Sequence, residues 1–486
     1  MKEIINKYKN KIFLFNSLKN KKELFIPINN NNINMYICGP TLYKNIHLGN
    51  CRTFIFFDIL YRYFKHLNFK IKYIRNLTDI NNNLQINLNN NYNYYNYLYN
   101  IKINYLKYNK ILNIFNLILP NIEPRSTNYI LEQINYIKYI IKLKYGYIKN
   151  GSVYFDINKY NKFLGYYGKI LNNINIKNNK KLKNKFSIYK KKIFDFVLWK
   201  KNKNNIIKWS SPWSKGVPGW HIGCTTMSNK LLGDYFDIHG GGIDLKFPHH
   251  ESEIILSNFI NNNTNNLAKY WLHTNILTIK NKKMSKSLNN LILPYDIIKG
   301  KFKITNNNNI NPFILKLYLI QTHYRKKISF SYKYLKTTTI NYLNLLKIFK
   351  IIKLIKPKKN TSSSINIKQL YNECYTSIND DFNIPLLLSK FFYIKKILLK
   401  CLNNKLQITN KDLNYLKKLI KFFIIDILGL KIIKNKKKTN TNKTKKIIKN
   451  ILKIREEMRK DKLYIYSDKL RNIINDYITI NDNKIN

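Results

Sequence analysis

Acidic residues are scarce in this sequence: 25 Asp and Glu stand against 87 Lys and Arg among 486 residues. The formal net charge is therefore +62, which favours a polyanionic partner such as nucleic acid and makes binding sensitive to salt. Alanine and glycine are also rare, whereas Lys, Asn, Ile, Tyr and Phe are abundant. A genome that drifts toward A+T-rich codons produces this whole pattern. We therefore count a basic residue as functional only where other evidence places it near a substrate.

Cysteine is limited to five residues, and long apolar runs are missing. An odd number of cysteines without an apolar secretory segment predicts reduced thiols in a cytosol-like compartment. No stretch approaches about 18 uncharged apolar residues, so we expect no membrane span. We predict a cytoplasmic protein. The alternative is a plastid-type organelle, because the basic start resembles a transit peptide, although a first strand expected near residue 23 leaves little room for one.

A β-α-β unit is predicted near the N-terminus of a chain that is long enough for more than one domain. Alternating apolar residues at 33–37 predict a strand, and two apolar rows at helical spacing predict a helix after residue 50. A second strand is expected over residues 71–75, which implies a parallel sheet with a right-handed crossover. Ligands bind such sheets at the carboxyl ends of the strands, where the sequence places Cys38, His47 and Asp79.

Further along the chain, the pattern predicts an insertion, a return of the α/β pattern and then helices. Residues 81–110 are compatible with a helix, and a basic low-complexity run at 171–192 predicts a flexible loop. Strands are expected at 235–242 and 271–279, and helical periodicity begins near residue 311. The buried face of a last helix is marked by Leu470, Ile473, Ile474 and Tyr477.

Two thiols, an imidazole and a carboxylate form the most informative set of residues, because they are ligands that zinc prefers. The set, called the tetrad below, consists of Cys38, Cys224, His249 and Glu253. Pro248 suits the first turn of a helix, and a spacing of four residues places His249 and Glu253 on one helix face. His250 and Glu251 are alternatives in the same cluster, but His250 points about 100° away from His249.

Two other segments carry chemistry that suits phosphate groups. His47-Leu48-Gly49-Asn50 lies where a helix follows a strand, so that backbone N–H groups and the helix dipole favour a phosphate. Lys283-Met284-Ser285-Lys286-Ser287 places two ammonium groups three residues apart, where they can neutralise charge on a leaving group. The first segment alone is weak evidence. Met and Ser between the lysines of the second argue against a chance basic loop.

Together these segments resemble the paired signatures of class I aminoacyl-tRNA synthetases. Further motifs are similar to those of the cysteinyl-tRNA synthetase family, and the resemblance is collinear over residues 23–480. These motifs include Cys38-Gly39-Pro40-Thr41-Leu42-Tyr43, Asp195-Phe196-Val197-Leu198-Trp199-Lys200, Pro218-Gly219-Trp220-His221-Ile222-Gly223-Cys224, His239-Gly240-Gly241-Gly242-Ile243-Asp244-Leu245, Thr322-His323-Tyr324-Arg325 and Asn379-Asp380-Asp381-Phe382-Asn383-Ile384-Pro385.

The resemblance implies an α/β fold: a Rossmann-like parallel-sheet catalytic domain with an inserted connective subdomain, followed by an α-helical anticodon-binding domain. The expected parts are the two catalytic halves at 23–124 and 211–270, the connective insertion at 125–210, a lysine-loop and stem-contact region at 271–335, a helical tRNA-binding domain at 336–430, a basic linker at 431–446 and a C-terminal anticodon-binding subdomain at 447–486.

The resemblance also implies a ligase that activates L-cysteine with ATP and transfers it to tRNA(Cys). One Zn²⁺ per chain, held by the tetrad, would take the substrate sulfur and reject serine, and Mg²⁺ would arrive with ATP. The expected catalytic residues are His47, Asn50, Lys283 and Lys286. The expected ATP contacts are His47, Gly49, Asn50, His239, Asp244 and Lys286. The expected cysteine contacts are Thr41 and Trp220. We expect a monomer.

Three departures from the family pattern stand out. Asn50 replaces a usual His, Gly223 replaces a usual acidic residue, and residues 80–84 lack a usual acidic pair and lysine. Two rival functions stay open. A ligase that joins cysteine to an amino sugar would lack a tRNA-binding tail, and the helical region 340–486 counts against it. A non-catalytic RNA-binding relative would have a decayed site, and the intact tetrad counts against that.

Overall fold

The structure is a computed structural model of all 486 residues. It describes residues 8–80, 94–171, 190–202, 207–260, 266–279, 282–284, 290–300, 310–358, 363–431, 441–461, 463, 464 and 466–468. The chain forms two compact units, Met1–Lys431 and Ile432–Asn486. The first unit carries all the motifs that the sequence singles out for chemistry, and each unit is described by itself below.

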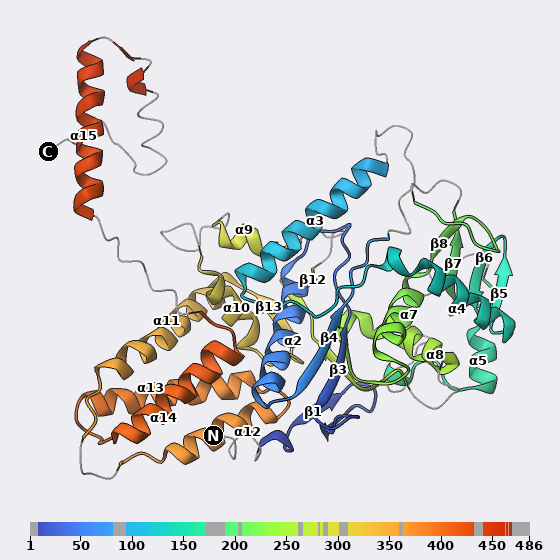
Figure 1. Ribbon diagram of the computed structural model, residues 1–486, viewed down its shortest axis with the longest axis horizontal. Coiled ribbons are helices and arrows are strands. Elements are labelled where there is room, and N and C mark those ends of the chain that lie inside the picture. Colours follow the sequence, from blue (N-terminus) through green and yellow to red (C-terminus); the bar gives the residue numbers. More distant parts are fainter. Residues whose placement is uncertain are drawn as a thin grey trace. The chain divides into compact units, whose positions relative to one another are not determined.

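A four-stranded parallel sheet lies at the centre of the first unit (Figure 1). Its strands in spatial order are β10 (Ala268–Thr274), β9 (Phe236–Gly242), β3 (Asn32–Ile37) and β4 (Lys70–Arg75). Ile37 at the end of β3 lies opposite Gly240 on one side and Arg75 on the other. The predicted α/β fold class with a Rossmann-like parallel sheet is confirmed.

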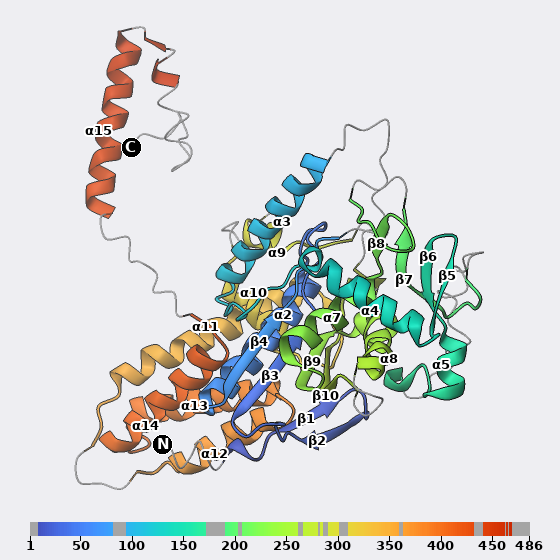
Figure 2. The ribbon, with the colours of Figure 1, turned by 45° about the vertical axis from the view of Figure 1, so that its right-hand side comes forward.

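Helix α2 (Leu48–His66) connects β3 to β4 and is buried along both of its apolar rows. It packs against the sheet on one side and against α10 (Pro312–Ile320) on the other (Figure 2). The approach to the sheet is close, since a Cβ on Gly240 would lie 2.1 Å from the ring of Phe57. Only glycine at that position lets α2 lie this near to β9.

The chain between β4 and β9 contains a long helix and an antiparallel subdomain. The long helix is α3 (Tyr94–Ile114). The subdomain sheet runs in the order β5 (Gly146–Lys149), β6 (Ser152–Phe155), β7 (Phe196–Lys201) and β8 (Gly216–Pro218). The helices and turns with it are η1 (Ser126–Tyr129), α4 (Ile130–Lys142), α5 (Ile157–Phe163) and η2 (Lys169–Leu171). Most of the run at 171–192 lies outside the described residues.

Two further helices return the chain to the central sheet. Helix α7 (Trp220–Leu232) follows β8, and α8 (Glu251–Ile260) packs against it. Between β9 and α8 lie two short turns, η4 (Ile243–Leu245) and η5 (Lys246–His250). Phe247 has extended backbone angles inside η5, so the regular helix begins after it.

Three details of the strands differ from the sequence-based prediction. The first strand begins at residue 13, not near residue 23, because β1 (Phe13–Asn16) and β2 (Lys21–Leu24) form a hairpin. The strand predicted at 271–279 is two strands. Asn275 and Ile276 leave the central sheet after β10, and β11 (Leu277–Ile279) pairs with β12 (Lys282–Lys283) and β13 (Ile328–Phe330). Strand β13 was not predicted.

The rest of the first unit is helical, as the periodicity from residue 311 predicts. Its helices and last turn are α9 (Pro294–Ile298), α11 (Tyr332–Leu354), α12 (Ile367–Asn379), α13 (Ile384–Leu402), α14 (Asn410–Ile420) and η7 (Lys421–Ile427). The second unit contains α15 (Thr441–Lys460), which begins inside the range predicted as a linker. The predicted apolar face at 470–477 lies outside the described residues. Within the described ranges, no helix combines the length and apolar character needed to cross a bilayer.

Candidate metal and nucleotide site

The tetrad comes together at the carboxyl end of β3. Cys38 follows β3 directly, Cys224 lies on α7, His249 lies in η5 and Glu253 lies in the first turn of α8. All four side chains are buried, and their ligand atoms lie within 4.8 Å of one another. His249 Nε2 is 2.8 Å from Glu253 Oε1 and 3.7 Å from Cys38 Sγ. Four residues from four segments thus converge on one point.

Neighbouring side chains orient the histidine and carboxylate of the tetrad. His221 Nδ1 lies 3.0 Å from His249 Nδ1, which leaves His249 Nε2 facing Cys38 and Glu253. His239 Nε2 lies 2.6 Å from Glu253 Oε2. Partners of this kind fix the ring orientation and tautomer of metal-binding histidines. The sequence-based prediction missed the role of His221, although it lies in the quoted motif that ends at Cys224.

The charges within the tetrad favour a bound cation. A hydrogen bond from the Cys38 thiol lowers the pKa of Cys224 to about 6, whereas burial raises the pKa of Cys38 well above its usual range. Burial opposes protonation of His249, but Glu253 and Cys224 outweigh it and raise its pKa to about 10. Burial likewise opposes ionisation of Glu253, but His249 and His239 hold its pKa well below the usual range. Two sulfurs, an imidazole and a carboxylate in a buried cluster fit Zn²⁺.

A second group of potential ligands overlaps the tetrad, since Cys38 and Glu253 also lie near His239 and His250. His250 Nδ1 is 2.7 Å from His273 Nε2, so one of its nitrogens already has a partner. The second group has only one thiol. The tetrad, with two thiols, is the softer set and suits zinc better.

Glu251, the other alternative ligand, is occupied by the insertion. Its carboxylate accepts hydrogen bonds from the backbone N–H groups of Gly168, Lys169 and Ile170, at 2.8, 3.1 and 2.9 Å. These N–H groups belong to the start of η2. Glu251 therefore ties η2 to α8, and both of its oxygens already accept hydrogen bonds.

The His47–Asn50 segment caps the start of α2. His47 is the N-cap residue, and its Nδ1 accepts the Gly49 N–H at 3.1 Å, while Asn50 Oδ1 accepts the His47 N–H at 3.2 Å. This reciprocal pair is a capping box in which His and Asn replace the usual residue types. Asn50, a departure from the family pattern, thus has a structural partner.

The segment that contains Lys283–Ser287 is called the lysine loop below. Its described ends on both sides lie against the start of α2. A Cβ on Gly49 would lie 3.6 Å from Met284 Cε, and the Leu48 N–H donates to the Ile292 carbonyl at 3.1 Å. Lys283 ends β12, and Lys286 lies outside the described residues. Met284 and Ile292 therefore lie next to the His47–Asn50 segment, although they are more than 230 residues away in sequence.

Two of the four remaining predicted contacts, Trp220 and His239, touch residues of the tetrad. Trp220 is 46% exposed and stacks on His249, with ring centroids 4.7 Å apart. Thr41 lies between Cys38 and α2 and bridges to Thr78. Asp244 is exposed in η4. His239 is fully buried and stacks on Trp271 at 4.3 Å.

The glycines at 240–242 are explained by packing within the protein. A Cβ on Gly241 would meet His250 at 3.1 Å, and one on Gly242 would meet Asp244 Oδ1 at 2.5 Å. Side chains of this chain therefore fill the space directly beside Gly241 and Gly242.

Comparison with known proteins places this arrangement in a family. The profile of the family described as tRNA synthetases class I (C) catalytic domain matches residues 24–340. Over 476 residues, the chain is 37% identical to a cysteine--tRNA ligase of Azobacteroides pseudotrichonymphae, with 95% of each chain covered. It is 39% identical to the cysteine--tRNA ligase of Wigglesworthia glossinidia brevipalpis, over 94% of this chain and 95% of the relative.

Two solved structures share the fold. A methionyl-tRNA synthetase of Mycobacterium tuberculosis in complex with methionyl-adenylate aligns with a TM-score of 0.53 at 9% identity, over 82% of this chain and 89% of that one. A putative arginyl-tRNA synthetase from Campylobacter jejuni gives 0.51 at 13% identity, over 88% of this chain and 98% of that one.

The parallel sheet, the capped start of α2 and the adjacent lysine loop define a class I tRNA synthetase. Within that class the chain belongs to the cysteine--tRNA ligase family, whose members are ligases that form aminoacyl-tRNA.

Proposed function

We propose that this chain activates L-cysteine with ATP and transfers it to tRNA(Cys). The observation that carries the proposal is the position of a sulfur-rich metal tetrad beside the capped start of α2. Cys38 and His47 are nine residues apart and both lie at the carboxyl end of β3. Ligands of open parallel sheets bind at this edge. A site for a thiol and a site for phosphates thus lie within reach of one small substrate.

The chain's own residues prepare the tetrad to hold Zn²⁺ and recognise cysteine. Cys224 reaches the thiolate form because Cys38 donates to it, and Glu253 stays ionised beside two imidazoles. When bound, Zn²⁺ supplies a soft Lewis acid that favours a substrate thiolate over the hydroxyl of serine. Trp220, exposed and stacked on His249, closes the apolar side of the cysteine pocket together with Thr41.

In the first chemical step the cysteine carboxylate attacks the α-phosphorus of ATP, and the bond to pyrophosphate breaks. His47, Gly49 and Asn50 lie at the start of α2, where the helix dipole stabilises phosphate. Lys283 and Lys286 neutralise the charge that develops on the pyrophosphate, and Mg²⁺ arrives with ATP. In the second step a terminal ribose hydroxyl of tRNA attacks the carbonyl, and AMP leaves.

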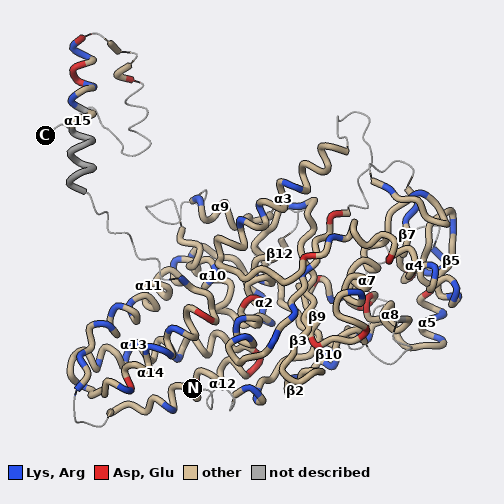
Figure 3. The backbone as a smooth tube through the Cα atoms, in the orientation of Figure 1, with Lys and Arg blue, Asp and Glu red and all other residues tan. Residues whose placement is uncertain are grey.

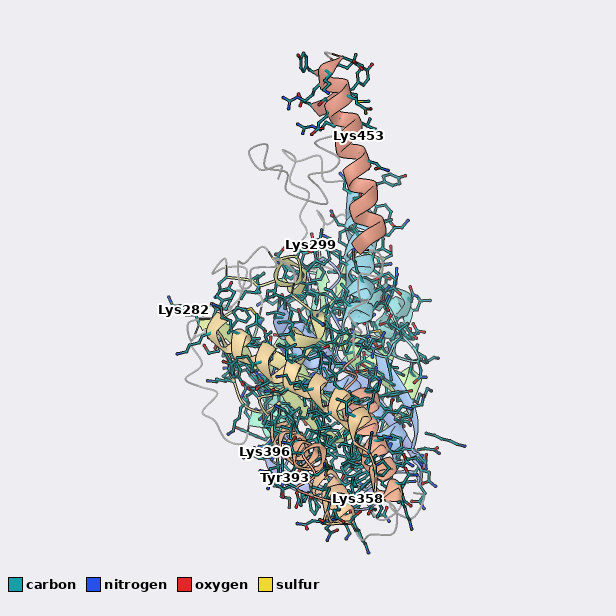
Figure 4. All side chains as sticks on the ribbon, turned by 90° about the vertical axis from the view of Figure 1, so that its left-hand side faces the viewer. Lys282, Lys299, Lys358, Tyr393, Lys396 and Lys453 are labelled. Atoms are coloured by element: carbon teal, nitrogen blue, oxygen red, sulfur yellow. The ribbon has the colours of Figure 1, made fainter. Side chains whose placement is uncertain are left out.

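The helical part of the first unit is proposed to bind tRNA. Lys and Arg follow α11, α13 and α14 (Figure 3), and Figure 4 shows the exposed side chains of Lys358, Tyr393 and Lys396 on one side of these helices. Lysines neutralise phosphates, and an exposed tyrosine can stack on a base. The domains are proposed to follow the sequence boundaries, with residues 336–430 and 447–486 contacting tRNA. A cytoplasmic monomer stays a prediction.

The test is aminoacylation with cysteine or serine, in the presence and absence of tRNA. We expect cysteine-dependent exchange of pyrophosphate into ATP without tRNA, cysteinyl-tRNA when tRNA is present, and no product with serine. Transfer to an amino sugar instead of tRNA would identify the rival ligase. Binding of tRNA without any exchange would identify a non-catalytic relative.

A cysteine variant links this activity to the metal. Cys224→Ser should lose bound zinc and cysteine-dependent exchange together, because a hydroxyl is a poorer zinc ligand than a thiolate. Cys401→Ser, a change to a buried thiol on α13, is the matched control and should keep both. Metal content is read by elemental analysis of the purified proteins. Full exchange activity in a zinc-free Cys224→Ser protein would contradict the role of the tetrad.

A further inference from the structure

Arg52 is a buried cation that lies between the start of α2 and the base of the lysine loop. It is 2% exposed and follows Asn50 by two residues. Its Nη1 donates to the carbonyls of Asn275 and Ile276, at 2.7 and 3.2 Å. Its Nη2 donates to the carbonyls of His323 and Lys326, at 3.0 and 2.6 Å. One guanidinium thus joins two chain segments to α2.

These two segments form the base from which the lysine loop extends. Asn275 and Ile276 connect β10 to β11, and residues 323–326 connect α10 to β13. Asn275 bonds the second segment directly, through its N–H to the Tyr324 carbonyl at 2.8 Å and its side-chain amide to the Arg325 carbonyl at 2.7 Å. Strands β11 and β13 then pair in parallel, and β12 leads from β11 to Met284.

Asp381, between α12 and α13, also contacts the segment 323–326. Its Oδ1 accepts from Tyr324 Oη at 2.6 Å, and its Oδ2 accepts from Arg325 Nε at 2.7 Å. Its carbonyl lies 3.1 Å from His323 Nε2, and its Oδ1 also accepts the Phe15 N–H at 2.9 Å. This carboxylate is fully buried and saturated with donors.

Two residues therefore hold the segment 323–326. Arg52 bonds its main-chain carbonyls, and Asp381 bonds its side chains. These bonds fix the β11–β13 sheet relative to α2. Met284 and Ile292 then contact the first turn of that helix. Groups that stabilise a transition state must be held within about 0.5 Å of the productive position. A shift of about 1 Å can cost about 100-fold in rate.

We propose that Arg52 and Asp381 are positioning residues for cysteine activation, because together they fix the β11–β13 sheet, from which β12 leads to Met284 beside the proposed phosphate site at His47. This proposal rests on the proposed function of that site. The lysines act on charge that develops as pyrophosphate leaves. Displacement of β12 relative to α2 therefore lowers kcat and leaves cysteine binding unchanged. A lysine cannot replace Arg52, since an ammonium lacks the planar fork that serves four carbonyls.

The experiment compares Arg52→Lys with Arg62→Lys. Arg62 lies on the same helix and donates to the carbonyls of Asn116 and Asp426 and to the carboxylate of Asp58. None of these partners belongs to the segments 275–276 and 323–326. We expect Arg52→Lys to lower the kcat of cysteine-dependent pyrophosphate exchange by about 10-fold to 100-fold. The KM for cysteine and the bound zinc should stay at the wild-type values. Arg62→Lys should keep the wild-type kcat at a comparable loss of thermal stability.

A second variant covers the case in which Arg52→Lys does not fold. Arg325→Lys loses the bond to Asp381, and its side chain is 36% exposed, so the fold should tolerate it. It should lower kcat in the same direction by a smaller factor. Two outcomes would overturn the positioning role. The first is an equal loss of kcat in Arg52→Lys and Arg62→Lys. The second is a wild-type kcat in both Arg52→Lys and Arg325→Lys. Absence of exchange in the wild-type protein would instead overturn the proposed function itself.

Discussion

At the scale of single residues, Lys316 shows how burial sets the charge of a side chain. It lies on α10, is fully buried, and donates to the carbonyls of Phe115 and Gly429, at 3.0 and 3.4 Å. Asp58 Oδ2 lies 3.5 Å away. Burial lowers the pKa of Lys316 to about 8, although the carboxylate of Asp58 opposes this, and Arg62 and Lys431 repel the ammonium further.

This shift predicts a pH dependence of stability. Below pH 8 Lys316 is protonated in both the folded and the unfolded chain. Between pH 8 and 10.5 the folded chain has lost the proton that the unfolded chain retains, so stability should rise with pH in this window. In Lys316→Met this contribution disappears. The free energy of unfolding, measured with urea across the window, should therefore rise less with pH in the variant than in the wild type.

The control is Lys396→Met, a change to an exposed lysine on α13, which should follow the wild-type pH profile. Parallel profiles for wild type and Lys316→Met would contradict the buried-cation account.

The sequence predicts contacts between residues that are close in the chain better than contacts between distant segments. His249 and Glu253 are four residues apart, so helical geometry alone predicts that they meet, and they do at 2.8 Å. The contacts of Arg52 with residues 323–326 and the contact of His239 with Glu253 join distant segments. Such contacts depend on strand order and helix packing, which residue spacing does not encode.

At the scale of elements, the first turn of α2 combines a helix cap with a phosphate site. Gly49 is required there by its neighbour, because a Cβ would lie 2.9 Å from His47 Cε1 and 3.0 Å from His47 Nδ1. The ring of His47 therefore rests directly over Gly49 and accepts its N–H. The same ring is the proposed phosphate contact.

Gly49→Ala should consequently weaken both the cap and activation. The methyl group displaces the His47 ring, and loss of a cap bond costs about 1 kcal/mol of stability. We expect a lower melting temperature and slower cysteine-dependent pyrophosphate exchange. Gly223→Ala, inside α7, is the matched control, since its Cβ would come no closer than 3.4 Å to any neighbour. That variant should be as stable as the wild type or more stable. Unchanged exchange in Gly49→Ala would contradict the phosphate role of His47.

Long elements were predictable and short ones were not. The helix after residue 50 and the strands at 33–37 and 71–75 span enough residues for a period to show, and the structure confirms them. Strands β11 and β13 have three residues each, too few for a period of two to be recognised. The abundance of Ile, Tyr and Phe throughout the chain weakens the signal further, because apolar residues also occur where no face is buried.

At the scale of the whole chain, the net charge has two possible sources, codon drift and selection for RNA binding. The value of +62 arises from Lys and Arg that are spread over both units, as the blue segments of Figure 3 show. Codon drift places lysines without regard to a ligand, whereas a tRNA interface requires them at phosphates. Both sources strengthen RNA binding through counterion release, which does not depend on sequence. Selectivity for tRNA(Cys) must then arise from other contacts.

Salt titration separates these contributions. Neutralising six phosphates would weaken tRNA binding about 1,000-fold between about 50 and 200 mM salt. The KM for tRNA(Cys) should therefore rise steeply with salt, while the KM for cysteine in pyrophosphate exchange should change little, since the buried tetrad is shielded from ions. A non-cognate tRNA of the same length is the control. Its affinity should fall with the same slope, so that the ratio of the two affinities stays constant. A KM for tRNA that does not respond to salt would show that the excess lysines lie outside the RNA interface.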